Sequence, residues 1–145
     1  MGKTDVSAGR SQVAAPLFTP ESANRALVFV RRVTQDIVRG YEELMSLRAR
    51  FEERSTDGTG ASALESLRSQ IEDRIGRLET LRDELAEVGC DLKDWSNGLV
   101  DFPALHEGRK VWLCWKLGED RIGFWHDLDT GFRGRQPIEP GFGAA

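Results

Sequence analysis

His126 is the residue whose side chain has the clearest chemical potential, because an imidazole changes charge near neutral pH. It is the single ionisable group on an otherwise apolar face of a predicted strand. With Asp127 or Asp129 beside it, a buried histidine could serve as a general base or as a metal ligand. The other interpretation is a core histidine that donates a hydrogen bond to a backbone carbonyl or a carboxylate. The sequence leaves both open, and the best candidates for a catalytic site are His126, Asp127 and Asp129.

A metal ion could be bound by Cys114, His126 and Asp129, with His106 or Glu119 as a further donor. These residue types suit zinc or iron. In an ideal strand register, however, Cys114 and His126 point to opposite faces of the sheet, so one ion could not reach both. Neither cysteine has a second cysteine at the spacing typical of zinc sites. We therefore expect no metal and no other cofactor, and the same geometry argues against a Cys–His nucleophilic pair.

The second face of the predicted sheet carries two tryptophans among charged side chains. Aromatic residues with polar neighbours are typical of protein interfaces. A glycine-punctuated basic loop over residues 131–137 follows and adds further cations. The tail over residues 130–143 could instead fold across this face. The residues expected to bind a partner here are Trp112, Trp125, Asp101, Lys116 and Arg135.

Alternation of apolar and polar residues predicts three short strands in the C-terminal part, over residues 99–105, 109–117 and 122–128. Glycine-containing segments between them favour tight turns, so the three strands form an antiparallel β-meander followed by an extended tail. This register places Phe102 opposite Leu113 and Leu113 opposite His126. One face of the sheet is then apolar and should pack against the rest of the molecule.

The middle of the chain predicts two long helices. A Thr-Pro-Glu start at residues 19–21 caps the first. Apolar residues then recur every three or four positions to about residue 54, which is the coiled-coil period. A second helix is expected to begin at a capping box formed by Ser62 and Glu65 and to end at Gly89. Together they predict a long antiparallel helical hairpin, and the fold class is α+β.

The chain divides into a disordered arm over residues 1–17, the hairpin over 18–89, and a small β subdomain with its tail over 90–145, packed on the hairpin. All four tryptophans, both cysteines and both histidines lie in the third part. The 145 residues carry 20 basic and 24 acidic side chains, and this net charge of −4 argues against nucleic acid as a partner. No apolar run is long enough to span a membrane. Two cysteines make no disulfide framework, which indicates a reducing cytoplasm.

The C-terminal part also contains a series of short motifs in a fixed order. They are Gly98-Leu-Val-Asp-Phe-Pro, a segment ending Leu-Cys-Trp at Trp115, Gly118-Glu119, Phe124-Trp-His-Asp-Leu-Asp and Gly131-Phe-Arg-Gly-Arg-Gln-Pro. The series resembles a bacterial family known only as domain of unknown function 2203, and the resemblance covers about residues 17–138. It implies no catalytic residues, because no activity is assigned to the family. The positions that lie within the family signature are Asp101, Cys114, Trp115, Glu119, Trp125, His126, Asp127 and Arg135.

From these observations we expect a non-enzymatic cytoplasmic homodimer that binds a partner through the aromatic sheet region. A hairpin of about 50 Å is too long for the remaining residues to cover. Pairing of two hairpins into a four-helix bundle would bury the apolar side chains left over. The alternative is a small metal-binding protein or enzyme that uses His126 with nearby carboxylates and Cys114. That alternative requires these side chains to meet in one place.

Overall fold

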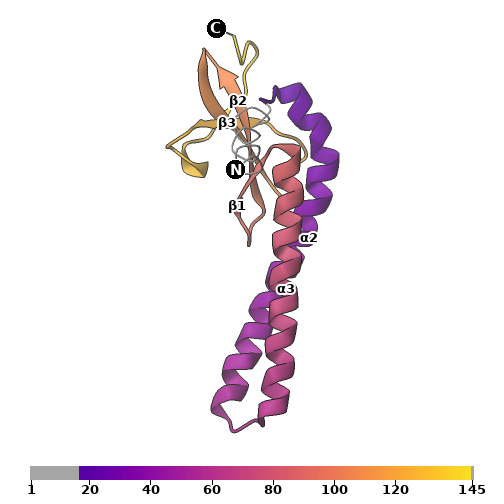
Figure 1. Ribbon diagram of the computed structural model, residues 1–145. Helices are drawn as coiled ribbons and strands as arrows, with labels where there is room; N and C mark the ends of the chain where they lie inside the picture. The colour runs from indigo at the N-terminus through magenta and orange to yellow at the C-terminus, as the bar shows by residue number, and fades with distance from the viewer. Residues whose placement is uncertain (1–16, 145) are drawn as a thin grey trace, which may run out of the picture.

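The computed structural model describes residues 17–144 and contains two long helices followed by a five-stranded sheet (Figure 1). Apart from Leu17, the arm predicted over residues 1–17 lies outside the described residues. The predicted α+β class and helical hairpin are confirmed. The elements are α2 (Pro20–Thr56), α3 (Ala61–Val88), β1 (Asp91–Asp94), β2 (Leu99–His106), β3 (Arg109–Lys116), β4 (Phe124–Asp127), the 3-10 turn η1 (Phe132–Gly134) and β5 (Gln136–Pro137).

The ends of the two helices follow from local hydrogen bonding. The Thr19 hydroxyl accepts a hydrogen bond from the Ser22 amide at 3.1 Å, and the Ser22 hydroxyl accepts one from the Thr19 amide at 2.9 Å. This exchange satisfies amides that the start of a helix leaves unpaired. The capping box predicted at Ser62 is wrong, because the N-cap of α3 is Gly60 and no side chain caps it. Gly89 ends α3 in the left-handed conformation, with φ 113°, as predicted.

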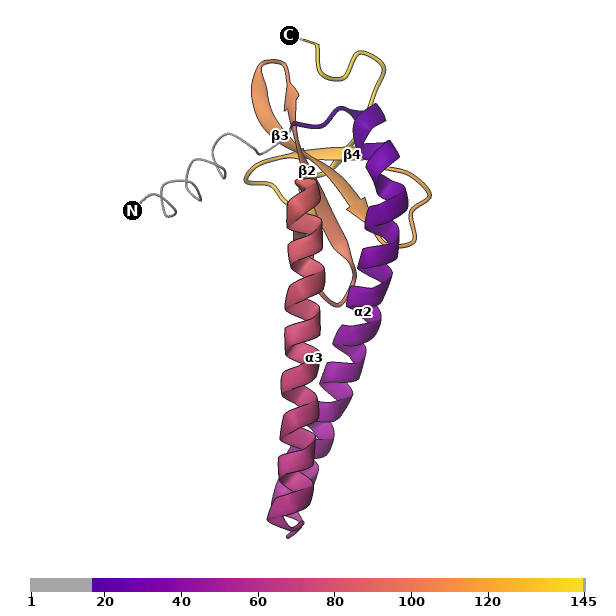
Figure 2. The same cartoon turned by 45° about the vertical axis from the view of Figure 1, so that its right-hand side comes forward.

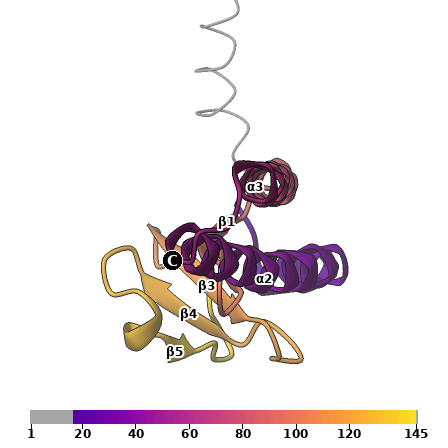
Figure 3. The same cartoon turned by 90° about the horizontal axis from the view of Figure 1, so that it is seen from below.

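The hairpin packs one half of its length against one face of the sheet, while the other half extends beyond it (Figures 1 and 2). Seen along the helices, α2 lies across the sheet and α3 stands to one side, near β1 (Figure 3). Apolar side chains spaced three and four apart on the helices meet the sheet in one core. Its most buried members include Leu27, Val30, Ile37, Leu81, Leu85, Phe102, Leu113 and Trp115. No described helix is long and apolar enough to cross a membrane.

The sheet is antiparallel, with five strands in the order β1-β2-β3-β4-β5, whereas three strands were predicted. The two additional strands lie at the edges. β1 has the sequence Asp-Leu-Lys-Asp, with one apolar residue, and β5 is two residues long. Neither strand is long enough to show an alternating pattern of apolar and polar residues, so neither could be predicted from the sequence. β5 belongs to the segment that was predicted to be an extended tail.

The predicted register between β2 and β3 is confirmed, with Phe102 opposite Leu113, but the register of the next strand is wrong by one residue. Leu113 lies opposite Trp125 instead of His126, and His126 lies opposite Trp112. Side chains alternate along a strand, so a shift of one residue exchanges the two faces. Trp125 therefore faces the helices, and His126 lies on the face that points away from them. We call this second face the outer face.

The shift has its origin in the segment before β4. Ile122 is 1% exposed and fills the core, but it lies outside the strand, which begins at Phe124. Asn24 of α2 holds the backbone of Ile122: its side-chain oxygen accepts from the Ile122 amide at 2.8 Å, and its amide donates to the Ile122 carbonyl at 3.3 Å. The next core residue is Trp125, three positions on. An uninterrupted alternation from Ile122 therefore assigns His126 to the wrong face.

Candidate metal centre

Asp101, Cys114 and His126 meet on the outer face of the sheet and form what we call the donor cluster. They come from the adjacent strands β2, β3 and β4, and Asp101 lies directly opposite Cys114. One ligand atom from each residue lies within 4.8 Å of the others, and each residue is at most 3% exposed. The prediction that Cys114 and His126 point to opposite faces is therefore wrong, because of the one-residue shift in register. Asp129, the predicted third ligand, is exposed and does not belong to this group.

Two contacts fix the ring of His126. Its Nδ1 lies 2.7 Å from the backbone oxygen of Asp127, which can only accept, so Nδ1 carries a proton. Its Nε2 lies 3.0 Å from Oδ2 of Asp101. These are the contacts expected of a core histidine. They are also those of a metal ligand, because a metal-binding imidazole commonly donates from one nitrogen to a carbonyl and presents the other to the ion.

Asp101 is a buried carboxyl group with one unsatisfied oxygen. Oδ2 contacts His126, and the Cys114 thiol beside the carboxyl is a weak further donor, whereas no N–H or O–H group of the described residues reaches Oδ1. Burial raises the pKa of Asp101, and the nearby positive charges of His126 and Lys93 oppose this rise. A buried polar atom without a partner costs about 1–3 kcal/mol. A cation held beside Oδ1 would remove that cost.

Cys114 carries a thiol that stays protonated at neutral pH. Burial raises the pKa of Cys114 to about 12, and the Asp101 carboxylate beside it adds to the rise. Such a thiol is a poor nucleophile on its own, because the thiolate is the reactive form. Both ring nitrogens of His126 are engaged with other groups, so the ring does not form a Cys–His nucleophilic pair. Coordination to a metal cation, in contrast, would remove the thiol proton.

Arg135, from the C-terminal tail, packs against the donor cluster. Its Nη1 lies 3.6 Å from Sγ of Cys114, and its guanidinium forms an ion pair with Glu119. The guanidinium also packs against two rings, 4.0 Å from the centre of Phe124 and 4.3 Å from the centre of Phe132. Donation to a sulfur from outside the coordination shell is the kind of contact that orients and stabilises a thiolate ligand. Arg135 was predicted to belong to a partner-binding surface, with no link to Cys114.

The five residues predicted to form one partner-binding surface lie in different environments. Trp125 is 7% exposed and faces the helices, whereas Asp101 is 2% exposed and belongs to the donor cluster. Arg135 covers Cys114, as described above. Trp112 and Lys116 are half-buried on the outer face. The tail folds over part of this face through Arg135 and β5, which is the alternative that the sequence left open.

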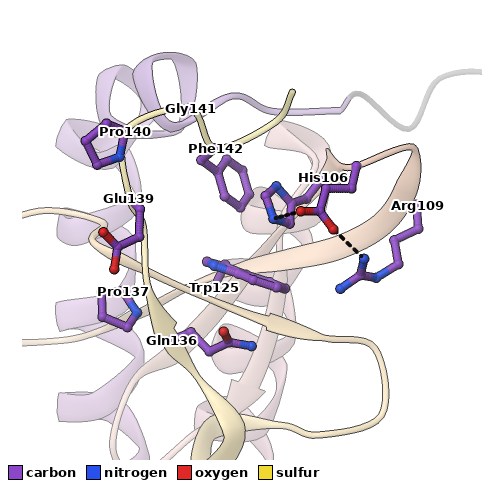
Figure 4. Close-up of a pocket in the computed structure, with 10 residues that line it drawn as sticks. His106, Arg109, Trp125, Gln136, Pro137, Glu139, Pro140, Gly141 and Phe142 are labelled. Carbon is purple, nitrogen blue, oxygen red and sulfur yellow. Dashed lines mark hydrogen bonds and ion pairs between the residues drawn. The ribbon is translucent and has the colours of Figure 1, made fainter. Parts of the chain in front are cut away.

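A separate hollow of about 520 Å³ lies beneath the C-terminal segment (Figure 4). Its walls include the rings of Trp125, His106 and Phe142, of which the last two stack with centroids 4.4 Å apart. The Gly143 amide donates to Nδ1 of His106 at 3.0 Å and ties the tail to β2. No residue of the donor cluster lines this hollow. The two features are therefore distinct.

The fold and the donor cluster together define a class of protein: a helical hairpin joined to an antiparallel sheet whose outer face holds a buried Asp–Cys–His group. The model of the family described as "Uncharacterized conserved protein (DUF2203)" matches residues 16–138, and the chain belongs to this family. The resemblance to domain of unknown function 2203 is thereby confirmed. All three residues of the donor cluster lie within the signature motifs that carried the resemblance. No curated protein and no solved structure matches the chain.

Proposed function

We propose that this protein binds one divalent transition-metal ion, with zinc as the preferred metal. The ligands are the Asp101 carboxylate, the Cys114 thiolate and Nε2 of His126. The observation that carries the proposal is the convergence of these three donor atoms within 4.8 Å of one another in a buried position. A mixture of thiolate, imidazole and carboxylate donors suits zinc, whereas magnesium and calcium prefer oxygen donors alone.

The charges of the donor cluster support a doubly charged cation. A carboxylate and a thiolate carry two negative charges and a neutral imidazole carries none, so a divalent ion makes the group neutral. Without an ion, the thiol keeps its proton, and Asp101 and His126 must share one further proton between Oδ2 and Nε2. Zinc usually takes four ligands, so these three residues would supply three of them.

The expectation of no metal rested on the predicted register, which placed Cys114 and His126 on opposite faces. The observed register removes that argument. A thiolate ligand must also be kept reduced, and both cysteines of the chain are free. This supports a reducing compartment, and we propose the cytoplasm.

Zinc titration of the metal-free protein tests the proposal. The chain is freed of metal with a chelator, incubated with zinc and passed through a gel-filtration column, and bound zinc is counted by elemental analysis. We expect one zinc per chain for the wild type and none for Cys114→Ser. Cys90→Ser is a matched control, because Cys90 is also buried and burial raises its pKa to about 12, but it lies at the end of α3. A wild type without zinc, or a Cys114→Ser variant that retains it, would contradict the proposal.

A second candidate function is that of an interaction module, as the sequence suggested. Large apolar side chains remain exposed on α2, with Val28 66% and Phe29 45% exposed. Both lie on the hairpin, whereas the donor cluster lies on the outer face of the sheet, so the two functions are compatible. Light scattering of the purified protein at micromolar concentration tests self-association, and a monomer would contradict it.

A further inference from the structure

The apolar stripe of the hairpin is buried where it meets the sheet. Toward the connection between the helices, some of its side chains are buried, as Leu47 and Leu67 are, and others are only partly buried. Where the sheet covers the helices, Ile37, Leu81 and Leu85 are at most 3% exposed. Toward the connection between the helices, Phe51 and Ile71 are only half-buried, although they continue the same spacing. The sheet does not reach this part of the hairpin (Figures 1 and 2). Within the described residues, the hairpin itself covers these two side chains only in part, and the sheet does not cover them.

A groove of about 430 Å³ runs between α2 and α3 at this exposed end, with Phe51 and Ile71 among the residues that line it. Four charged residues complete its lining. Each helix contributes an arginine and, four residues later, a glutamate: Arg48 and Glu52 from α2, and Arg68 and Glu72 from α3. The groove therefore combines an apolar floor with equal numbers of positive and negative charges.

Three of these four charges have no ion-pair partner in the described part of the chain. Only Arg68 is paired, with Glu65 at 3.5 Å, and its guanidinium lies 5.6 Å from the centre of the Phe51 ring. In contrast, Arg74 and Glu43 form an ion pair that joins the two helices. The positive and negative charges around the groove are thus available to a molecule that docks there.

We propose that a second copy of this chain docks in the groove around a two-fold axis. In such an interface the same surface faces itself, so every contact occurs twice. A surface with unpaired charges of both signs can complement itself, and Arg48 of one copy would pair with Glu72 of the other. Phe51 and Ile71 of both copies would fill the space between, and the four helices form a bundle. This inference rests on the interaction-module function and is independent of metal binding.

Exchanging the charges of single residues tests the interface on the metal-free 145-residue chain by multi-angle light scattering. The wild type should show a mass twice the 16.2 kDa of one chain. Arg48→Glu and Glu72→Arg, each alone, place like charges together and should weaken association roughly tenfold or more. The variant with both changes should restore the dimer. Arg77→Glu is the control, because it lies five residues from Glu72, on a different side of α3 and outside the groove.

The outcomes separate the claims. A monomeric wild type would overturn both this interface and the interaction-module function. A dimer that neither single variant weakens, or that Arg77→Glu weakens equally, would overturn this interface alone. A double variant that stays dissociated, although its far-UV circular dichroism matches that of the wild type, would also overturn this interface alone. Zinc content measured on the same samples reports separately on the donor cluster.

Discussion

Replacing Asp101 by asparagine should stabilise the metal-free protein and weaken its affinity for zinc. In the metal-free state, Asp101 and His126 share a proton in a site where each is at most 3% exposed. Asparagine keeps the shape of the side chain, and its amide can donate to Nε2 of His126, because Nδ1 carries the ring proton. The substitution therefore removes a desolvated charge and keeps the hydrogen bond.

The expected magnitude follows from what the change preserves. Oδ1 has no N–H or O–H donor in the wild type, and the asparagine oxygen would take the same place, so that cost cancels. Replacing both members of a buried ion pair by well-packed apolar residues is often neutral or stabilising, by up to about 4 kcal/mol, because it removes the cost of burying the charges. Because only one group changes here, we expect about 1–2 kcal/mol, or a rise in Tm of about 3–8 °C. Asp101→Ala leaves Nε2 of His126 without a partner and should cost about 2–4 kcal/mol.

Urea unfolding of the metal-free proteins, followed by circular dichroism, measures these differences. The same experiment at a zinc concentration 100-fold above the Kd should add about 2.7 kcal/mol to the wild type. At that concentration it should add much less to Asp101→Asn. The reasoning is refuted if metal-free Asp101→Asn is less stable than the wild type by about 1 kcal/mol or more. The carboxylate would then serve the fold, and the donor cluster would be a structural ion pair.

Two further predictions concern pH and the backbone. The folded protein holds the pKa of both Cys90 and Cys114 at about 12, above the ordinary value of 9.0, so each thiol supports folding below the ordinary pKa and loses that support as pH rises toward 12. Above about pH 9, each thiol should therefore lower the free energy of unfolding of the metal-free protein by up to about 1.4 kcal/mol per pH unit. Urea unfolding at a series of pH values measures this slope, and Cys114→Ser should halve the part that the two thiols contribute. An unchanged slope would contradict the raised pKa of Cys114. Gly98 has φ +74°, and an added Cβ would lie 2.9 Å from Cβ of Leu117 and from Cγ2 of Thr34, so Gly98→Ala should lower the free energy of unfolding by about 2–4 kcal/mol. Thermal unfolding that shows no loss would mean that this turn can shift at little cost.

The helical hairpin was predictable because its signals are local. A polar N-cap at Thr19, apolar residues at the coiled-coil spacing and a glycine at position 89 each act through neighbouring residues. The start of α3 was less predictable. A Ser-x-x-Glu pattern at residues 62–65 predicts Ser62 as the N-cap, yet the N-cap is Gly60, two residues earlier. Ser62 and Glu65 favour a helix start in this region, but the pattern does not determine which residue becomes the N-cap.

The donor cluster was not predictable as a group, because it depends on one contact between distant residues. Asp101 and Cys114 were placed on the same face, since the turn between β2 and β3 is tight and sets their register. His126 joins them because β4 begins after Ile122, whose backbone is hydrogen-bonded to Asn24, almost 100 positions earlier in the chain. No sequence pattern within β4 predicts this contact with Asn24. The sequence offered one signal: Asp101, Cys114 and His126 all lie within the motifs that carry the family resemblance.

The most direct test of the central claim is the X-ray absorption spectrum of the zinc-loaded protein at the zinc edge. The proposed ligands predict one sulfur at about 2.3 Å together with nitrogen and oxygen donors at about 2.0–2.2 Å. Cys90→Ser should give the same spectrum, whereas Cys114→Ser should hold no zinc and give no signal at the zinc edge. A wild-type spectrum with nitrogen and oxygen neighbours alone would contradict the account, because Cys114 would then not bind the metal.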